Sequence, residues 1–231
     1  MKDINYKCAV IDHDDTAVDS SESIHYPIYL EIMSEIRPNI EPLTADGFIE
    51  MNRLSGIKRY YTEDLSFDGK EWNDAYDFWV SHPLRKTIPD FYKGFLEMFD
   101  LFKSNGGIVA VVSHSDEESI RMHYNSFSSS YLLDKVIGAS KDPSNNKPYT
   151  LPLRNIIQEF NLSNYDIIVI DDLDPGIDMA VKMDVDTIGV GWSHENPDTF
   201  KKKCKFYADK VDDLENILFE NGKRLLWNFR S

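Results

Sequence analysis

Cysteine is scarce in this sequence. Only Cys8 and Cys204 occur among its 231 residues. Cys8 lies in an apolar run that we expect to be buried, so a framework of disulfides is disfavoured and reduced thiols in the cytoplasm are expected. A hydrophobic core must then stabilise the fold, and the hydrophobic content of 42% is sufficient for one.

Long apolar runs are also missing. None approaches the length of a membrane span, and charged residues stand at the amino terminus, where a signal peptide needs an apolar segment. We therefore expect a cytoplasmic protein that has no contact with a membrane.

Basic residues are few relative to acidic ones. The chain has 25 Lys and Arg residues against 40 Asp and Glu residues, which gives a net charge of −15. Nucleic-acid binding depends on basic side chains that neutralise phosphates, so this class of partner is disfavoured. An anionic substrate would need a local cation, which a metal ion or a few Lys or Arg side chains could supply.

Short apolar runs rich in β-branched residues are present, and helical patterns separate them. We expect strands at 8–11, 108–112, 136–139, 167–170 and 187–190. Strands that alternate with helices predict an α/β fold, a Rossmann-like parallel sheet with helices on both faces.

Residues 19–85 differ from this pattern because they contain helical stretches and no strand-like run. We therefore predict a small α-helical cap domain at 19–85, inserted into a core domain formed by 1–18 and 86–231. Within the core, Pro89 is expected to open a helix that continues through Phe102 and ends at Asn105-Gly106-Gly107.

Polar side chains follow several of the expected strands at the point where each strand ends. Asp12 and Asp14 follow the first strand, Ser113 follows the second, and Asp171-Asp172 follow the run at 167–170. These ends share one edge of a parallel sheet, where ligands bind in open α/β folds. Carboxylates that converge there repel one another unless a cation relieves them, and Mg²⁺ is a natural partner.

The order of these motifs resembles the haloacid dehalogenase superfamily of hydrolases, and in particular its members with a helical C1 cap, the phosphoglycolate phosphatases and β-phosphoglucomutases. The resemblance covers essentially the whole chain. It rests on a strand followed by DxDxT, a serine after a strand, a Lys-Pro pair, and two acids followed by Gly-Ile. The matching residues are Asp12, Asp14, Thr16, Ser113, Lys147, Pro148, Asp171, Asp172, Gly176 and Ile177.

The resemblance implies a role for each catalytic residue. Asp12 would be the nucleophile that forms an aspartyl-phosphate, and Asp14 the general acid and base. Ser113 and Lys147 would hold the transferring phosphoryl oxygens. Lys141 is a second candidate for the lysine role, but Lys147 is preferred because it precedes a proline.

The resemblance also implies a Mg²⁺ cofactor. Asp12, the backbone carbonyl of Asp14 and Asp172 would hold the ion, and Asp171 would either ligate it directly or orient a bound water. Asp15 stands where the family usually has glycine. Either the loop tolerates a side chain at this position, or Asp15 adds charge at the mouth of the site.

Further residues are candidates for substrate contacts. Thr16 belongs to the first motif, and His114 follows Ser113, where it either touches substrate or is solvated. In the cap, Arg53, Lys58 and Arg59 flank residues 54–57, at a place similar to the cap loop that enters the active site in relatives. Their alternative role is that of a solvated helix end.

We therefore predict a Mg²⁺-dependent phosphatase, a monomer or homodimer, which acts on a small-molecule phosphate ester through an aspartyl-phosphate. A phosphomutase of the β-phosphoglucomutase type shares the same catalytic set and remains an alternative. A haloacid dehalogenase is disfavoured because it has no use for Asp14. A phospho-accepting receiver module would be about half this length, and a non-catalytic binding protein is disfavoured because every expected chemical group is present.

Overall fold

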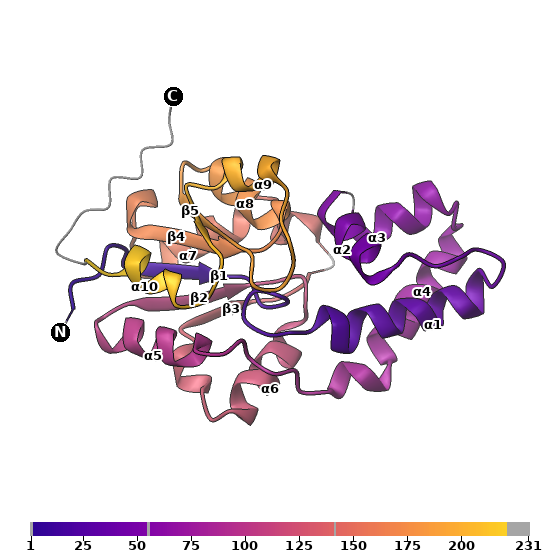
Figure 1. The fold of residues 1–231 in the computed structure, drawn as a ribbon, viewed down its shortest axis with the longest axis horizontal. Helices are drawn as coiled ribbons and strands as arrows, with labels where there is room; N and C mark the ends of the chain where they lie inside the picture. The colour runs from indigo at the N-terminus through magenta and orange to yellow at the C-terminus, as the bar shows by residue number, and fades with distance from the viewer. Residues whose placement is uncertain (1, 55, 141, 221–231) are drawn as a thin grey trace. The chain divides into compact units, whose positions relative to one another are not determined.

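The protein forms two compact units. The computed structural model describes residues 2–54, 56–140 and 142–220. The core unit comprises Met1–Val18 and Phe91–Ser231, and the helical unit comprises Asp19–Asp90 (Figure 1). Among the described residues, no helix has both the length and the apolar character that a membrane crossing requires.

The core unit is built on a six-stranded sheet in the order β3-β2-β1-β4-β5-β6. All neighbouring strands pair in parallel, so their carboxyl ends meet at one edge. The predicted α/β fold class is confirmed. The strands are β1 (Cys8–Ile11), β2 (Ile108–Val112), β3 (Lys135–Ile137), β4 (Ile167–Asp171), β5 (Asp186–Val190) and β6 (Phe206–Ala208).

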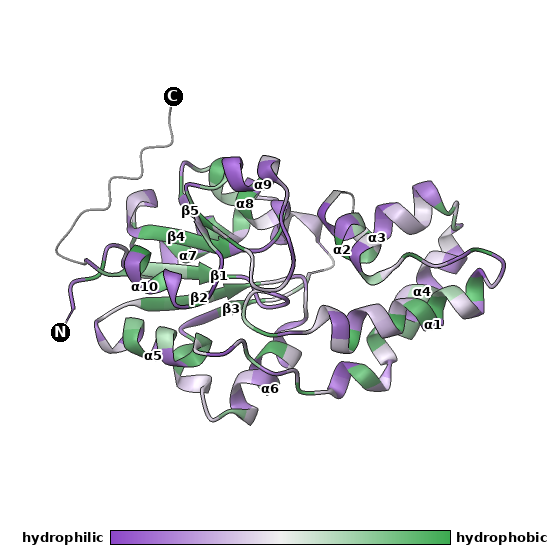
Figure 2. Cartoon of the chain, in the orientation of Figure 1, coloured by the Kyte–Doolittle hydropathy of each residue, from purple (hydrophilic) through white to green (hydrophobic). Residues whose placement is uncertain are grey.

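Strand β1 lies in the centre of the sheet, and its side chains alternate between two hydrophobic clusters. Ala9 and Ile11 face one cluster, whereas Cys8 and Val10 face the other. Both faces of the sheet are therefore apolar, and the central strands β1, β2 and β4 are largely green in Figure 2.

Helices supply the outer layer on each face. The first cluster is completed by α5 (Phe95–Ser104), α6 (Glu117–Ser126) and α10 (Asp213–Leu218), and the second by α7 (Leu151–Phe160) and α8 (Asp174–Val181). The short helix α9 (Asp198–Lys203) follows β5 and contributes Phe200, which is buried.

The helical unit has its own core of aromatic and aliphatic side chains, in which Tyr61 stacks on Phe67 with ring centroids 4.7 Å apart. A capping box between Asp68 and Glu71 fixes the start of its last long helix. Its helices are α1 (Tyr26–Ile36), α2 (Ala45–Leu54), α3 (Gly56–Arg59) and α4 (Gly69–Ser81), with π-helical turns at Ser21–His25 and Tyr60–Asp64.

Two local expectations were wrong. The helix expected to open at Pro89 begins only at Phe95, because Phe91 forms a bridge with Val18 and Gly94 takes a left-handed conformation with φ of 85°. In addition, β6 and α9 were not expected. β6 has only three residues, and the second half of the six-residue α9 consists of lysines, so neither has a clear periodic pattern.

Candidate active site

The carboxyl ends of β1, β2 and β4 place the candidate residues next to one another. Ile11 pairs with Val111 on one side and with Ile170 on the other. The backbone N–H of Asp12 then donates to the carbonyl of Ile170 at 2.9 Å, which continues the ladder by one residue. Asp12 therefore lies beside the end of β4, where Asp171 is the last residue of the strand and Asp172 comes next.

Lys147 is the buried cation of this edge. Its Nζ lies 2.7 Å from Oδ1 of Asp12 and 2.8 Å from Oδ2 of Asp171. Burial by itself would lower the pKa of Lys147, but the charges of the two carboxylates outweigh burial and raise it. Lys147 is therefore charged at neutral pH and links β1 to β4.

The acids at this edge outnumber their cation. Burial raises the pKa of Asp12 to about 7 although Lys147 opposes the shift, and repulsion from Asp171 adds to it. The pKa of Asp172 is raised well above its usual range by burial and by repulsion from Asp171, Asp12 and Asp15. These carboxyl groups are thus poorly compensated by protein groups alone.

Three of the acids are arranged as a cation site. Asp12, Asp171 and Asp172 each offer a carboxylate oxygen, and these oxygens lie within 4.8 Å of one another. All three side chains are buried. A set made only of oxygen ligands suits a hard divalent cation, and such an ion would offset the excess negative charge.

Hydroxyl groups hold two of the acids in place. The Thr16 hydroxyl donates to Oδ1 of Asp172 at 2.9 Å. The Ser113 hydroxyl donates to Oδ2 of Asp14 at 3.2 Å and accepts a hydrogen bond from the Ser115 N–H. Each hydroxyl therefore connects the strand ends that supply the site.

His114 and Trp192 fix neighbouring backbone. Nε2 of His114 lies 3.0 Å from the carbonyl oxygen of Lys147, so this ring nitrogen must be the donor. Burial lowers the pKa of His114, with a further contribution from the charge of Lys147. The indole N–H of Trp192 donates to the carbonyl of Thr16 at 3.1 Å, which ties the loop after β5 to the loop after β1.

The backbone at Asp15 and Gly176 explains two features of the motifs. Asp15 has φ of 57°, in the left-handed region that favours glycine, and Asp is among the residues that tolerate it. This conformation accounts for the glycine that the family usually has at this position. A Cβ on Gly176 would lie only 1.8 Å from Oδ2 of Asp171, so α8 could not begin where it does with a larger residue.

The three basic candidates of the helical unit make contacts within that unit. Arg53 pairs with Glu50 at 2.7 Å, and Arg59 pairs with Glu63 at 2.7 Å. The Nζ of Lys58 lies 5.6 Å from the ring centroid of Trp72. Their contact with substrate stays a prediction.

Lys141, the second candidate for the lysine role, lies outside the described residues.

His194 is a residue that sequence reasoning missed. It lies on the loop after β5, and its Nε2 is 3.7 Å from Oδ2 of Asp172. Like Asp12, Ser113 and Asp172, it belongs to a polar segment that follows an expected strand. That segment was the available signal.

Removal of the Thr16 hydroxyl is expected to destabilise the fold. Thr16→Val keeps the shape of a fully buried side chain but leaves Oδ1 of Asp172 without its donor. Leaving this buried acceptor without its donor corresponds to about 1–3 kcal/mol of unfolding free energy. Urea unfolding in EDTA measures it, with Thr199→Val on the exposed surface of α9 as the matched control. A loss no larger than that of the control would show that this hydrogen bond contributes nothing.

Comparison with known proteins identifies the family. The profile of the haloacid dehalogenase-like hydrolases matches residues 9–190. The chain therefore belongs to this family of hydrolases, as the motif order indicated. A search of curated proteins finds no match.

Solved structures share the fold at low sequence identity. A predicted phosphoglycolate phosphatase from Haemophilus somnus has a TM-score of 0.73 at 17% identity, over 92% of this chain and 98% of its own. A predicted phosphatase from Clostridium acetobutylicum has a TM-score of 0.73 at 21% identity, over 90% and 96%. CbbY from Rhodobacter sphaeroides, solved in complex with xylulose-(1,5)bisphosphate, has a TM-score of 0.71 at 12% identity, over 89% and 94%.

Proposed function

We propose that this protein is a Mg²⁺-dependent phosphatase that hydrolyses a small phosphorylated metabolite through an aspartyl-phosphate on Asp12. One observation carries the proposal. The buried carboxylate of Asp12 lies 2.7 Å from Lys147 and beside the Asp171–Asp172 pair, at the carboxyl edge of the sheet. A carboxylate beside a fixed ammonium and a cation site is suited to receive a phosphoryl group.

The reaction has two steps. In the first, an oxygen of Asp12 bonds to phosphorus, the bond to the leaving alkoxide breaks, and Asp14 gives that alkoxide its proton. In the second, Asp14 takes a proton from water, the water oxygen bonds to phosphorus, and the bond to Asp12 breaks. Ser113 and Lys147 stabilise the phosphoryl oxygens in both steps.

The Mg²⁺ ion would be held by the carboxylates of Asp12 and Asp172, the backbone carbonyl of Asp14, and Asp171 either directly or through water. The buried excess of negative charge supports this assignment, because the three grouped carboxylates face one buried lysine. When bound, Mg²⁺ reduces the repulsion between Asp12 and the incoming phosphate dianion.

The substrate is expected to be a small organic phosphate. Two neighbours of similar fold, one described as a phosphoglycolate phosphatase and one bound to a sugar bisphosphate, support this class. We further propose that the helical unit at 19–90 acts as the cap that selects the substrate, with Arg53, Lys58 and Arg59 as the candidate contacts.

A panel of phosphorylated metabolites tests the proposal. The panel includes phosphoglycolate and several sugar phosphates, each with Mg²⁺ and with EDTA, and free phosphate and sugar-phosphate isomers are both measured. We expect phosphate release that requires Mg²⁺. Turnover that persists in EDTA would contradict the metal requirement, and isomerisation without phosphate release would assign the protein to the phosphomutases instead.

A further inference from the structure

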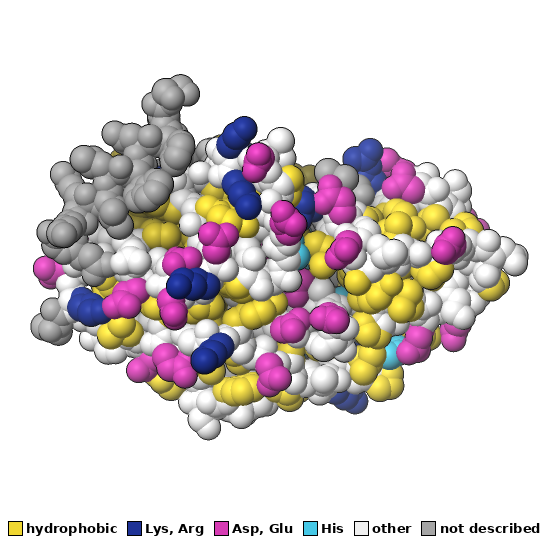
Figure 3. Space-filling view, in the orientation of Figure 1, with side chains coloured by type: hydrophobic (Ala, Val, Ile, Leu, Met, Phe, Trp, Pro, Cys, Tyr) yellow, Lys and Arg dark blue, Asp and Glu magenta, His cyan; other side chains and the backbone are white. Residues whose placement is uncertain are grey.

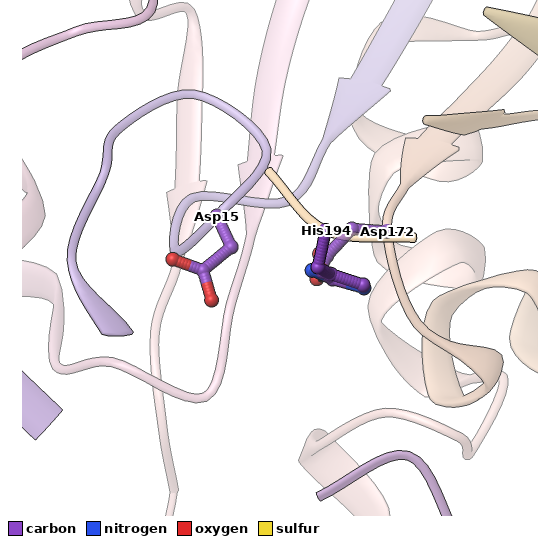
Figure 4. Close-up of side chains that lie close together, drawn as sticks. All are labelled: Asp15, Asp172 and His194. Atoms are coloured by element: carbon purple, nitrogen blue, oxygen red, sulfur yellow. The ribbon is translucent and has the colours of Figure 1, made fainter. Parts of the chain in front are cut away.

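A second group of potential metal ligands lies beside the catalytic acids. It consists of Asp15 from the loop after β1, Asp172 from the end of β4, and His194 from the loop after β5. Their ligand atoms lie within 4.8 Å of one another, and Figure 4 shows Asp15 opposite the closely placed Asp172 and His194. Ligands about 2.1 Å from one ion lie at most about 4.2 Å apart, so closure by roughly half an ångström would complete the site.

The second oxygen of Asp172 points to a missing ligand. Asp172 is only 1% exposed, and its Oδ2 accepts no hydrogen bond from the described part of the chain. Nε2 of His194 lies 3.7 Å from this oxygen, which is too long for a hydrogen bond. A buried carboxylate oxygen that lacks a hydrogen bond is costly, and a bound cation would satisfy it.

Asp172 has the capacity to serve two cations at once. An ionised carboxylate has about four acceptor positions, and the Thr16 hydroxyl uses one of them. Asp172 also belongs to the oxygen-only group with Asp12 and Asp171. The two groups therefore share one carboxylate, as the ligands of two-metal sites often do.

The charge of the region leaves room for a second divalent ion. Four aspartates of the edge are buried, namely Asp12, Asp15, Asp171 and Asp172. Lys147 is buried with them and pairs with two of them, Asp12 and Asp171, so the four carboxylates exceed this lysine by about three negative charges when all four are ionised. One divalent cation would leave an excess of about one, before a phosphate dianion adds two more.

The ligand types differ between the two groups, and this difference sets their metal preference. The first offers oxygens only, which suits Mg²⁺. The second includes an imidazole nitrogen, which favours transition metals such as Zn²⁺ and Mn²⁺ over Mg²⁺. His194 supplies this difference, whereas Asp15 completes the second group with an oxygen ligand that a glycine at its position could not supply.

We propose that Asp15, Asp172 and His194 form a second cation site that binds a divalent transition metal while Mg²⁺ occupies the oxygen-only site. This site goes beyond the proposed phosphatase function, because its occupancy can be measured without substrate. Through the shared Asp172, an ion in this site would also alter the affinity of the first site for Mg²⁺.

Cobalt binding to the full-length protein tests the inference. Co²⁺ is titrated into protein that is saturated with Mg²⁺, and binding is followed by visible absorbance and by calorimetry, with Zn²⁺ as the competitor. We expect one Co²⁺ per chain, displaced by Zn²⁺. His194→Ala and Asp15→Gly should each weaken Co²⁺ binding at least about tenfold, because each removes one of three ligands.

Controls separate loss of the site from loss of the fold. His25→Ala, in the helical unit, removes a histidine that is not part of the group and should leave Co²⁺ binding unchanged. If circular dichroism shows that His194→Ala is unfolded, His194→Gln is titrated in its place. This substitution keeps most of the side-chain volume. The inference would be overturned if the wild-type protein failed to bind Co²⁺ in the presence of Mg²⁺. It would also be overturned if the His194 and Asp15 variants bound Co²⁺ as tightly as the wild type. Both outcomes are independent of the phosphatase assay.

Discussion

Asp12→Asn is expected to lower phosphate release at least about 1,000-fold, which corresponds to about 4 kcal/mol of transition-state free energy. The amide is nearly isosteric with the carboxylate but is a poor nucleophile, so the first step of the proposed reaction cannot proceed. Initial rates with the best substrate of the panel, at saturating Mg²⁺, measure the effect.

The Asp12 variant is expected to remain folded. It removes one of several buried negative charges, and Lys147 keeps its ion pair with Asp171 at 2.8 Å. Asp184→Asn is a matched control, because Asp184 is exposed and precedes β5 at the opposite edge of the sheet. Asp184 has φ of 53°, a conformation that Asn also tolerates. Activity of Asp12→Asn close to that of this control would contradict the assignment of the nucleophile.

Lys147→Met is expected to affect stability and activity together. The substitution leaves Asp12 and Asp171 buried without their ammonium partner. Breaking a buried ion pair by removing one member typically costs about 3–5 kcal/mol of unfolding free energy. Loss of a charge that stabilises the phosphoryl oxygens should also reduce turnover by about 100-fold or more.

The stability loss of Lys147→Met should depend on pH. Lys147 lowers the pKa values of Asp12 and Asp171, so both values rise further in the variant, above their values in the unfolded chain. The folded variant then binds protons that the unfolded chain does not, so its stability falls as pH rises from the unfolded-chain pKa of about 4 to the raised folded pKa values, which lie above the value of about 7 for Asp12 in the wild type. The deficit relative to wild type is therefore larger at about pH 9 than at about pH 5.

Urea unfolding in EDTA at these two pH values measures the deficit. Lys202→Met, on the exposed surface of α9, is the control and should change the unfolding free energy by no more than about 0.5 kcal/mol. A deficit for Lys147→Met that does not change with pH would show that Lys147 does not lower the pKa values of Asp12 and Asp171.

The arrangement of the sheet edge could be predicted because it depends on strand ends. Short apolar runs such as 108–112 and 167–170 have few alternatives to buried strands, and parallel pairing then aligns the residues that follow them. Asp12 and Asp171 come together for this reason. Their catalytic roles remain predictions that the experiments above address.

Other features depend on contacts that no local pattern encodes. The start of α5 is set by the bridge between Phe91 and Val18, residues far apart in the sequence. The position of His194 depends on how the loop after β5 folds back, and the Trp192 hydrogen bond to Thr16 holds that loop in place. The left-handed backbone at Asp15 could be suspected from the family glycine, but its proximity to His194 could not.

The acidic surface is consistent with the composition. Figure 3 shows Asp and Glu side chains spread over the visible face, with Lys and Arg at scattered positions between them. A phosphate anion would meet few attractive charges on such a surface. On the proposed function, attraction comes from the site itself, from Lys147 and from the proposed cations.

Chemical trapping of the acyl-phosphate tests the central claim most directly. Protein is mixed with substrate and Mg²⁺, quenched with acid, reduced with borohydride and digested with trypsin, and the peptide 8–53 is sequenced by mass spectrometry, since trypsin does not cleave the Arg37–Pro38 bond. Borohydride converts an aspartyl-phosphate to homoserine and leaves free aspartate unchanged. The account predicts homoserine at position 12, dependent on substrate and absent in Asp12→Asn. An active enzyme that yields no homoserine at position 12, or yields it at another aspartate, would contradict the account.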